Sequence, residues 1–139
     1  MDQEVYQYLN SANRNKILVS KSKDKNVEYL DVGKELSKEI RCIKDLNRIS
    51  FKAKAILFDL LNKSIKIHDD YGKVCAISNC GILLENELKI DFINLLDTYS
   101  KDYCLILHWE GLIEKDNLFF LNKKKGIKFN LEKLSYIKI

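Results

Sequence analysis

The sequence predicts an α/β fold in which a small, mostly parallel sheet is flanked by helices. Residues 74–111 read as a strand, an amphipathic helix and a second strand. The second strand, 103–109, is a continuous apolar run typical of a strand covered on both faces, so we place it at the sheet centre. Strands alternate with helices along the chain, as parallel neighbours joined by crossovers require. With 139 residues, the chain is predicted to form a single domain over 1–139.

The first part of the chain is predicted to contain a short helix and two strands. Residues 3–11 alternate too irregularly for a strand and suit a helix. The apolar run 17–19 reads as a buried strand, and the polar loop 21–26 separates it from a second strand at 27–32. Only the seven residues 20–26 lie between the two predicted strands. That is too few for a helical crossover, so these strands either pair antiparallel or are not adjacent. The helix is expected to dock through Val5, Tyr6 and Leu9.

Two helices follow, each recognised by apolar residues at helical spacing. The first is expected to begin at Gly33. Its apolar positions are Leu36, Ile40, Ile43 and Leu46. The second has a wider apolar stripe, and residues 62–66 are expected to fray. That stripe consists of Phe51, Ala55, Phe58, Leu61 and Ile65, widened by Leu57 and Leu60.

The middle of the chain contains the best-defined elements. A turn signal at 68–72 precedes a strand at 74–77, which ends at 78–81. Residues 83–88 are ambiguous, whereas 90–99 is a clear helix before the central strand. The helix residues expected to face inward are Phe92, Ile93, Leu95, Leu96 and Tyr99.

The C-terminal part is predicted to be a series of short elements. Gly111 turns the chain, and 118–121 forms another strand. A turn at 123–126 follows, and a short helix or strand covers 131–137.

Composition places the chain among ordinary globular proteins. Apolar residues make up 46% and charged residues 32%. No apolar run approaches the roughly 20 residues that span a bilayer, and the first residues do not resemble a secretory signal. We therefore expect a cytoplasmic protein with no membrane partner.

Charge is unevenly distributed along the chain. Residues 14–66 hold 14 basic and 7 acidic side chains, residues 67–121 hold 4 and 10, and residues 122–139 hold 6 and 1. Such asymmetry can steer a partner or let two copies pack head to tail as a homo-oligomer, although solvated surface explains it as well. A net charge of +4 is too small to indicate DNA binding by itself.

The four cysteines lie in or beside apolar segments, and none forms a CxxC pair. We interpret Cys42, Cys75, Cys80 and Cys104 as buried, reduced thiols, with a metal site or a disulfide as the alternative. The two histidines are isolated, which argues against a zinc site or a cysteine nucleophile.

The sequence contains no recognisable nucleotide site. A phosphate-binding loop needs glycines, a lysine and a hydroxyl, and neither Gly33-Lys34 nor Gly72-Lys73 has the rest of that pattern. No two glycines have the spacing of a dinucleotide fingerprint. We therefore predict no cofactor and no enzymatic activity.

The candidate contact residues lie at two places. His108, Trp109 and Glu110 end the central strand at its carboxyl edge, where open α/β sheets bind ligands. Trp109 is also expected as a core or hinge aromatic. Lys123, Lys124 and Lys125 form a basic cluster, expected at a solvated hairpin tip, with a phosphate or nucleic-acid contact as the alternative.

Residues 82–111, continuing through DNLFFLNKKKG, resemble the BrxF family, the small P-loop proteins of type 3 BREX phage-defence systems. The family has an acid-bearing strand, a Leu-rich turn, an acidic and Leu-Lys-Asp segment, a helix, a hydrophobic strand and Trp-x-Gly. The matching residues are Glu85, Glu87, Leu88, Lys89, Asp91, Leu95, Leu96, Ser100, Trp109 and Gly111, and the upstream run YLDVGKELSKEI matches the family's second strand and following helix.

Two departures from the family change what this resemblance implies. Family members place a glycine-rich phosphate loop and its helix after the first strand, whereas this chain has a short polar loop. Ser78, followed by Asn79, stands where the family has its acid. The resemblance thus implies a degenerate P-loop NTPase-like domain without ATP binding or hydrolysis.

Our leading hypothesis is a non-catalytic accessory or adaptor subunit of a bacterial anti-phage defence complex, with a larger ATPase or DNA-modifying subunit as its partner. The alternative is a small winged-helix-type DNA-binding module. In that interpretation, residues 90–99 form a helix, the strands about Leu118 and Phe129 form a wing, and the three lysines lie at its tip. It accounts poorly for the continuous apolar run 103–109.

Overall fold

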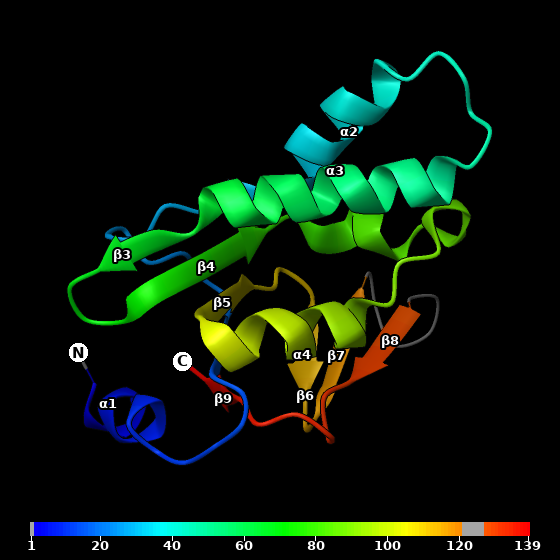
Figure 1. Ribbon diagram of the computed structural model, residues 1–139. Coiled ribbons are helices and arrows are strands. Elements are labelled where there is room, and N and C mark those ends of the chain that lie inside the picture. Colours follow the sequence, from blue (N-terminus) through cyan, green and yellow to red (C-terminus); the bar gives the residue numbers. More distant parts are fainter. Residues whose placement is uncertain (1, 121–126) are drawn as a thin grey trace.

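The computed structural model describes residues 2–120 and 127–139, and its centre is a six-stranded sheet (Figure 1). The strand order is β2-β4-β5-β1-β9, and β3 also pairs with β4. Every neighbouring pair is parallel except β3 with β4, so the predicted α/β class with a mostly parallel sheet is confirmed. The strands are β1 (Ile17–Ser20), β2 (Leu30–Asp31), β3 (Lys66–His68), β4 (Gly72–Ser78), β5 (Cys104–His108) and β9 (Ile137–Lys138).

The central position predicted for residues 103–109 is confirmed. Leu105 of β5 is in register with Ile17 of β1 on one side and with Cys75 of β4 on the other. All five residues of β5 and all four of β1 are buried. Burial on both faces explains why these strands read as unbroken apolar runs.

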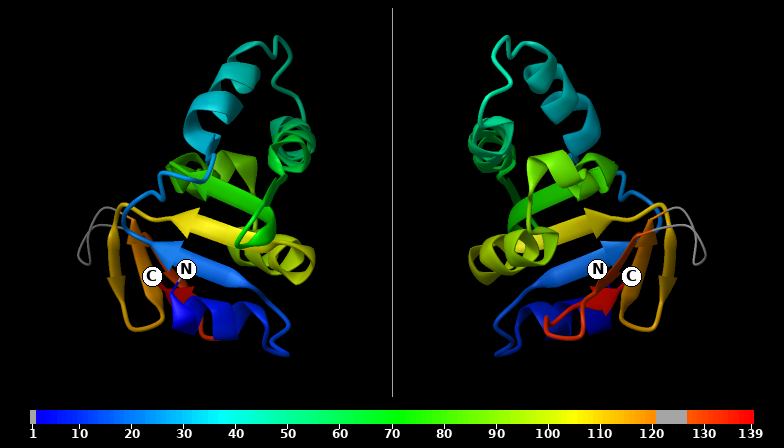
Figure 2. Two further views of the ribbon diagram at one scale, coloured as in Figure 1. Left: turned by 90° about the vertical axis from the view of Figure 1, so that its left-hand side faces the viewer. Right: turned by 90° about the vertical axis from the view of Figure 1, so that its right-hand side faces the viewer.

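Helices cover both faces of the sheet, unequally (Figures 1 and 2). On one face, α2 (Val32–Arg41), α3 (Ile49–Ser64) and α4 (Phe92–Asp102) enclose the main core. On the other, α1 (Gln3–Leu9) packs over a smaller cluster. Successive side chains of a strand point to opposite faces of the sheet, so alternate residues of the same strand pack in different cores. Leu105 and Leu107 belong to the larger core, and Cys104 and Ile106 to the smaller.

The first two strands are not adjacent, as one of the two predicted alternatives required. β4 and β5 lie between β1 and β2, so the chain crosses to the far edge of the sheet within residues 21–29. The predicted loop over 21–26 is confirmed, but strand pairing within 27–32 is limited to Leu30–Asp31. The reason is local: the Asp31 carboxylate accepts a hydrogen bond from the Lys34 backbone N–H at 2.9 Å, and this cap starts α2 at Val32.

The N-terminal helix docks through a different residue than predicted. Val5 is buried as expected, but Tyr6 is 59% exposed, and Tyr8 takes its place in the core. The Tyr8 hydroxyl contacts the Ser135 carbonyl oxygen at 2.8 Å and accepts a hydrogen bond from the Ile17 backbone N–H at 3.0 Å. One side chain thus fastens α1 to β1 and to the C-terminal segment.

Helix α2 is shorter than its apolar pattern predicted. It ends at Arg41, so Ile43 and Leu46 lie beyond it, and Leu46 is 65% exposed. The backbone N–H of Ile43 donates to the Ile40 carbonyl at 3.0 Å, which tightens the last turn. The chain then runs through a polar segment to α3.

The inward stripe predicted for α3 is confirmed at Leu57 and Leu61 but wrong at Phe51, Ala55 and Phe58. Ala53, Leu57 and Leu61 are buried, whereas Phe51 and Phe58 are 63% and 42% exposed. Ala53, Leu57 and Leu61 define the buried side, and the aromatic side is turned roughly a third of a circle away from it, with Phe58 stacked on Tyr99 of α4. The expected fraying over 62–66 is also wrong: α3 continues to Ser64, and β3 pairs antiparallel with β4 across the predicted turn.

Between β4 and α4 the ambiguous segment folds as two short 3₁₀ helices, η1 (Cys80–Leu84) and η2 (Asn86–Leu88). Asp91 then caps α4 by accepting a hydrogen bond from the Asn94 backbone N–H at 3.0 Å. Of the residues expected to face inward, Phe92, Leu95, Leu96 and Tyr99 are buried, and Ile93 is partly buried.

A second, antiparallel sheet connects β5 to the C-terminal strand. It consists of β6 (Leu112–Glu114), β7 (Asn117–Phe120) and β8 (Ile127–Asn130) in that order. β7 matches the predicted strand 118–121, whereas the predicted turn 123–126 lies outside the described residues. The predicted helix or strand over 131–137 is mostly irregular, because β9 begins only at Ile137.

None of the helices within the described ranges has the length and apolar character needed to cross a membrane.

Candidate functional site

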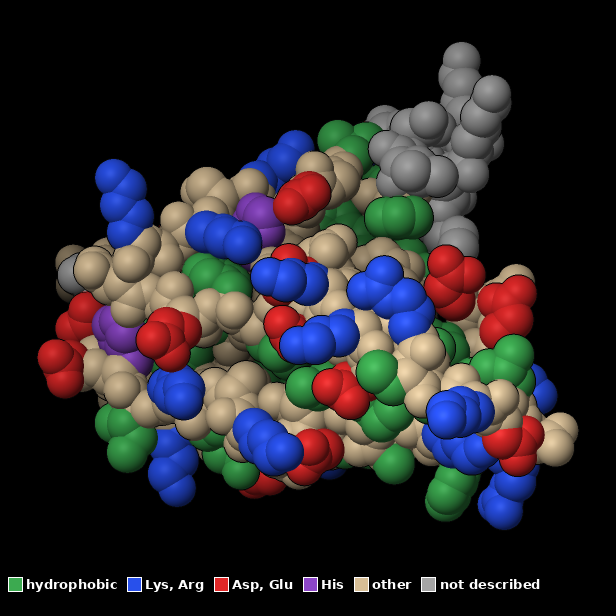
Figure 3. Space-filling view, turned by 90° about the horizontal axis from the view of Figure 1, so that it is seen from above, with side chains coloured by type: hydrophobic (Ala, Val, Ile, Leu, Met, Phe, Trp, Pro, Cys, Tyr) green, Lys and Arg blue, Asp and Glu red, His purple; other side chains and the backbone are tan. Residues whose placement is uncertain are grey.

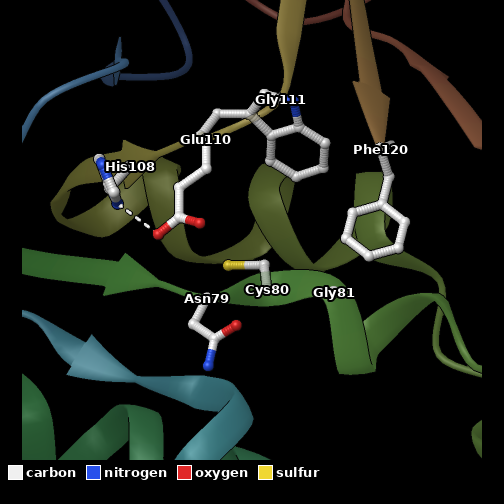
Figure 4. A pocket seen from close by; sticks show the side chains of 8 residues that line it. Asn79, Cys80, Gly81, His108, Glu110, Gly111 and Phe120 are labelled. Atoms are coloured by element: carbon white, nitrogen blue, oxygen red, sulfur yellow. Dashed lines mark ion pairs between the residues drawn. The ribbon is translucent and has the colours of Figure 1, made fainter. Parts of the chain in front are cut away.

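A small pocket lies at the carboxyl ends of β4 and β5, the edge where parallel sheets bind ligands. Its volume is about 210 Å³, below the roughly 300–1,000 Å³ of sites for drug-sized ligands. Such a space fits one functional group or side chain. The lining residues, shown in Figure 4, are Asn79, Cys80, Gly81, His108, Trp109, Glu110, Gly111 and Phe120.

His108 is the most unusual side chain of this pocket. It is 8% exposed, and its Nε2 lies 3.2 Å from the carbonyl oxygen of Lys21. A carbonyl only accepts, so Nε2 carries the proton and Nδ1 of the neutral ring presents a lone pair. Nδ1 is buried and has no hydrogen-bond partner within the described structure. The Glu110 carboxylate lies 4.0 Å away, too far for a hydrogen bond (Figure 4).

Asn79 forms the opposite wall and closes the N-terminus of α2. Its backbone is left-handed, with φ of 53°, and its side-chain Nδ2 donates to the Asp31 carboxylate at 2.9 Å. The Asn79 carbonyl accepts from the Gly33 backbone N–H at 2.9 Å. A Cβ at Gly33 would overlap the Asn79 side chain, which explains the glycine there. Two backbone donors of this helix end, those of Gly33 and Lys34, are therefore used by the chain itself.

The charge of Asp31 is favoured in this arrangement. Burial raises the pKa of its carboxyl, but hydrogen bonds from the Lys34 backbone and from Asn79, with the charges of Lys23 and Lys34, lower it below its usual value overall. The residue adjoining the pocket wall is thus a stable carboxylate.

Trp109 and Gly111 attach the second sheet to the pocket. The Trp109 indole Nε1 donates to the Phe119 carbonyl at 3.1 Å, and its ring packs 6.1 Å from Phe92. A Cβ at Gly111 would overlap the same carbonyl and lie 3.0 Å from the indole nitrogen. Trp109 is only 4% exposed, so it is the core aromatic that the sequence allowed, with part of it lining the pocket.

The cysteines are mostly as predicted. Cys75, Cys80 and Cys104 are buried free thiols, but Cys42 is exposed, because α2 ends before it. Cys80 lines the pocket, and burial raises the pKa of its thiol well above the usual value, which keeps it protonated and a poor nucleophile. Within the described ranges, no three His, Cys, Asp or Glu side chains converge as metal ligands would.

Part of this site was predicted from the sequence. The predicted contact residues His108, Trp109 and Glu110 line one pocket, although only Glu110 is well exposed. Phe120 was not predicted there, because β7 reaches this edge of the sheet only through long-range strand pairing. Lys123, Lys124 and Lys125 lie outside the described residues.

A second candidate site, also missed, lies on the outer side of α3. We call Phe51, Ala55 and Phe58 the α3 outer face; all three are exposed. The Arg48 guanidinium lies 4.8 Å from the centre of the Phe51 ring, and Phe58 stacks on Tyr99 of α4 at 6.2 Å. Viewed from above, the molecule shows apolar, basic and acidic side chains interspersed (Figure 3).

The chain matches no protein-family model, no curated protein and no solved structure with which it was compared.

Proposed function

We propose that the protein is a non-catalytic accessory or adaptor subunit of a cytoplasmic, BREX-like anti-phage defence complex, and that it acts through protein–protein contacts. Its partner is a larger ATPase or DNA-modifying subunit with an acidic surface that receives the α3 outer face. The observation that carries the proposal is the pair of exposed phenylalanines on α3.

Exposed aromatics on one helix face favour a protein contact. Phe51 and Phe58 are separated by seven residues, so they lie two turns apart on the same side of α3. Their side of the helix is turned roughly a third of a circle from the buried stripe of Ala53, Leu57 and Leu61. Aromatic side chains in a polar surround are enriched at the energetic centres of protein interfaces.

The charge around these aromatics specifies the partner's chemistry. Residues 41–66 contain seven basic side chains and two acidic ones. An acidic partner surface would complement this excess and speed the encounter. The acidic segment 67–121 of a second copy is a weaker candidate, because its core strands are buried.

Three further contacts support a degenerate P-loop origin. The segment that follows β1 is fixed by its own hydrogen bonds: the Ser20 hydroxyl donates to the Ser22 carbonyl at 2.6 Å, and Tyr71 donates to Asp24 at 3.1 Å. At the end of β4, the Ser78 hydroxyl faces the Leu30 carbonyl at 3.5 Å. Groups that would meet a nucleotide in a P-loop protein are thus engaged with the chain.

The test is a quantitative pull-down from the native host with three tagged proteins: wild type, Phe51→Ser with Phe58→Ser, and Ile67→Ser as the control. Ile67 is 83% exposed on β3, so the control removes a comparable apolar side chain elsewhere. We expect one ATPase or DNA-modifying protein to be retained by wild type and control and lost with the double variant.

The purified partner should then lose at least about tenfold in affinity for the double variant, as expected when an interface aromatic is removed. Equal recovery with all three baits, or a partner of neither class, would overturn the proposal.

A winged-helix-type DNA-binding module is the second candidate. Leu118 of β7 pairs antiparallel with Phe129 of β8, as the two strands of a wing hairpin would. The α4 residues Phe92 and Leu96, however, are buried in the core of the parallel sheet. A duplex affinity that falls steeply with salt, and falls again when Lys123, Lys124 and Lys125 become alanine, would favour this function over the adaptor role.

A further inference from the structure

The pocket at the carboxyl edge offers hydrogen-bond acceptors and a negative charge. His108 Nδ1 presents a buried lone pair without a partner in the described structure. Beside it lies the Glu110 carboxylate, 4.0 Å away and 75% exposed, free to adjust toward a ligand. Across the pocket, the Asn79 Nδ2 donates to Asp31, and the Asn79 amide oxygen lies on the pocket side (Figure 4).

This set of groups selects the charge of a ligand. An anion would meet a carboxylate and a lone pair, so phosphate and carboxylate groups are disfavoured. The basic side chains Lys23 and Lys34 act on Asp31, which does not line the pocket. A buried acceptor without a donor is costly, and a ligand that donates to it removes that cost.

The walls of the pocket narrow the choice to a planar cation. Phe120 and Trp109 supply aromatic surface, which attracts cations and stacks well with guanidinium. Guanidinium also has five N–H donors in a rigid plane and binds a carboxylate through two parallel hydrogen bonds. An ammonium group lacks both that plane and that fork.

We propose that this pocket is a binding site for one guanidinium group. Glu110 accepts two of its N–H groups, His108 Nδ1 accepts another, and Phe120 lies against its plane. The group comes either from an arginine side chain of another protein or from a free guanidino compound. The proposal goes beyond the adaptor role and does not depend on the α3 outer face.

The test uses the full chain and its single tryptophan, Trp109, whose fluorescence reports on the pocket. The probe is N-acetyl-arginine amide, and N-acetyl-citrulline amide is the matched control, because its urea group has the same shape without the charge. Binding is measured by fluorescence titration and by calorimetry. We expect saturable binding of the arginine probe and at least about tenfold weaker binding of citrulline.

The variants are Glu110→Gln and, as a control, Glu87→Gln, which removes an exposed carboxylate outside the pocket. Glu110→Gln should weaken binding of the arginine probe about tenfold, and Glu87→Gln should leave it unchanged. Because Glu110 is exposed, thermal unfolding should be the same for both variants.

Two further probes distinguish the sources of the guanidinium. If it belongs to a protein, acetyl-Gly-Arg-Gly-amide should bind more tightly than agmatine; if it belongs to a free compound, agmatine should bind at least as tightly. Equal binding of arginine and citrulline, no binding of either, or no effect of Glu110→Gln would overturn the proposal, as would preferential binding of inorganic phosphate. None of these results would affect the test of the α3 outer face.

Discussion

Replacing Gly111 by alanine should destabilise the protein through a steric conflict at the junction of its two sheets. The added Cβ would overlap the Phe119 carbonyl, which is backbone and can move only if β7 moves. That carbonyl also accepts the Trp109 indole hydrogen bond at 3.1 Å. One methyl group therefore disturbs both the packing of the hairpin and the only hydrogen bond described for the indole.

The expected cost follows from those two effects. Forcing a methyl group into packed structure costs about 1–3 kcal/mol, and loss of a buried hydrogen bond about 1 kcal/mol. The sum, about 2–4 kcal/mol, corresponds to a fall in melting temperature of roughly 6–15 °C for a domain of this size. Unfolding in urea, followed by Trp109 fluorescence, measures the free energy directly.

Gly72→Ala is the matched control. Gly72 has a positive φ of 74°, but nothing lies within 4 Å of an added Cβ, so only the left-handed backbone costs about 1–2 kcal/mol. Its native Trp109 emission should stay unchanged, whereas Gly111→Ala should alter it. A Gly111→Ala protein as stable as wild type, with unaltered emission, would refute the close approach of Gly111 to Phe119.

Three further results are expected. Asn15 donates to Asp97 at 2.9 Å, and this hydrogen bond, opposed by burial and assisted by nearby cations, lowers the pKa of that carboxyl. Asp97→Asn should therefore reduce the free energy of unfolding at pH 7, and its difference from wild type should shrink as the pH falls below about 4, through the lowered pKa of Asp97. Urea titrations over a series of pH values from 7 downward measure this difference. Iodoacetamide at pH 8 should alkylate Cys42 in the native protein and spare the three buried cysteines, because burial raises the pKa of a thiol, that of Cys75 to about 11. Mass spectrometry counts the adducts. Modification of all four cysteines before unfolding would contradict the buried positions. Leu107→Ala should cost about 2–5 kcal/mol, because this side chain is fully buried at the sheet centre, and a loss below about 1 kcal/mol in the same urea assay would argue against that position.

The strands that could be predicted are those buried on both faces. The runs at β1 and β5 are continuous and apolar because no residue in them faces water. This pattern can be recognised in the sequence without knowing which strands lie beside them. β3 could not be predicted, because its residues are mostly exposed and its existence depends on pairing with β4. The order of the strands is likewise a long-range property.

The error in α3 has a physical cause. Phe51 and Phe58 are the largest apolar residues of the helix, so a pattern weighted by hydrophobicity turns them inward. The buried side instead consists of Ala53 with Leu57 and Leu61, the two members of the predicted stripe that are buried. A helix with two apolar sides satisfies the pattern in either orientation, and only tertiary packing chooses between them.

The candidate pocket was predictable only at its strand end. His108 and Glu110 follow from the rule that ligands bind at the carboxyl edge of a parallel sheet. Asn79 reaches the same pocket through the left-handed turn after β4. The unpaired Nδ1 depends on the carbonyl of Lys21, which lies 87 residues earlier in the chain and carries no sequence signal for this contact.

We propose that this sheet edge binds no nucleotide and serves contacts with other groups. This proposal is tested most directly by calorimetric titration of the full chain with ATP and Mg²⁺, with Trp109 fluorescence recorded in parallel. We expect no binding heat and no change in emission up to millimolar ATP. Binding at micromolar affinity would contradict it.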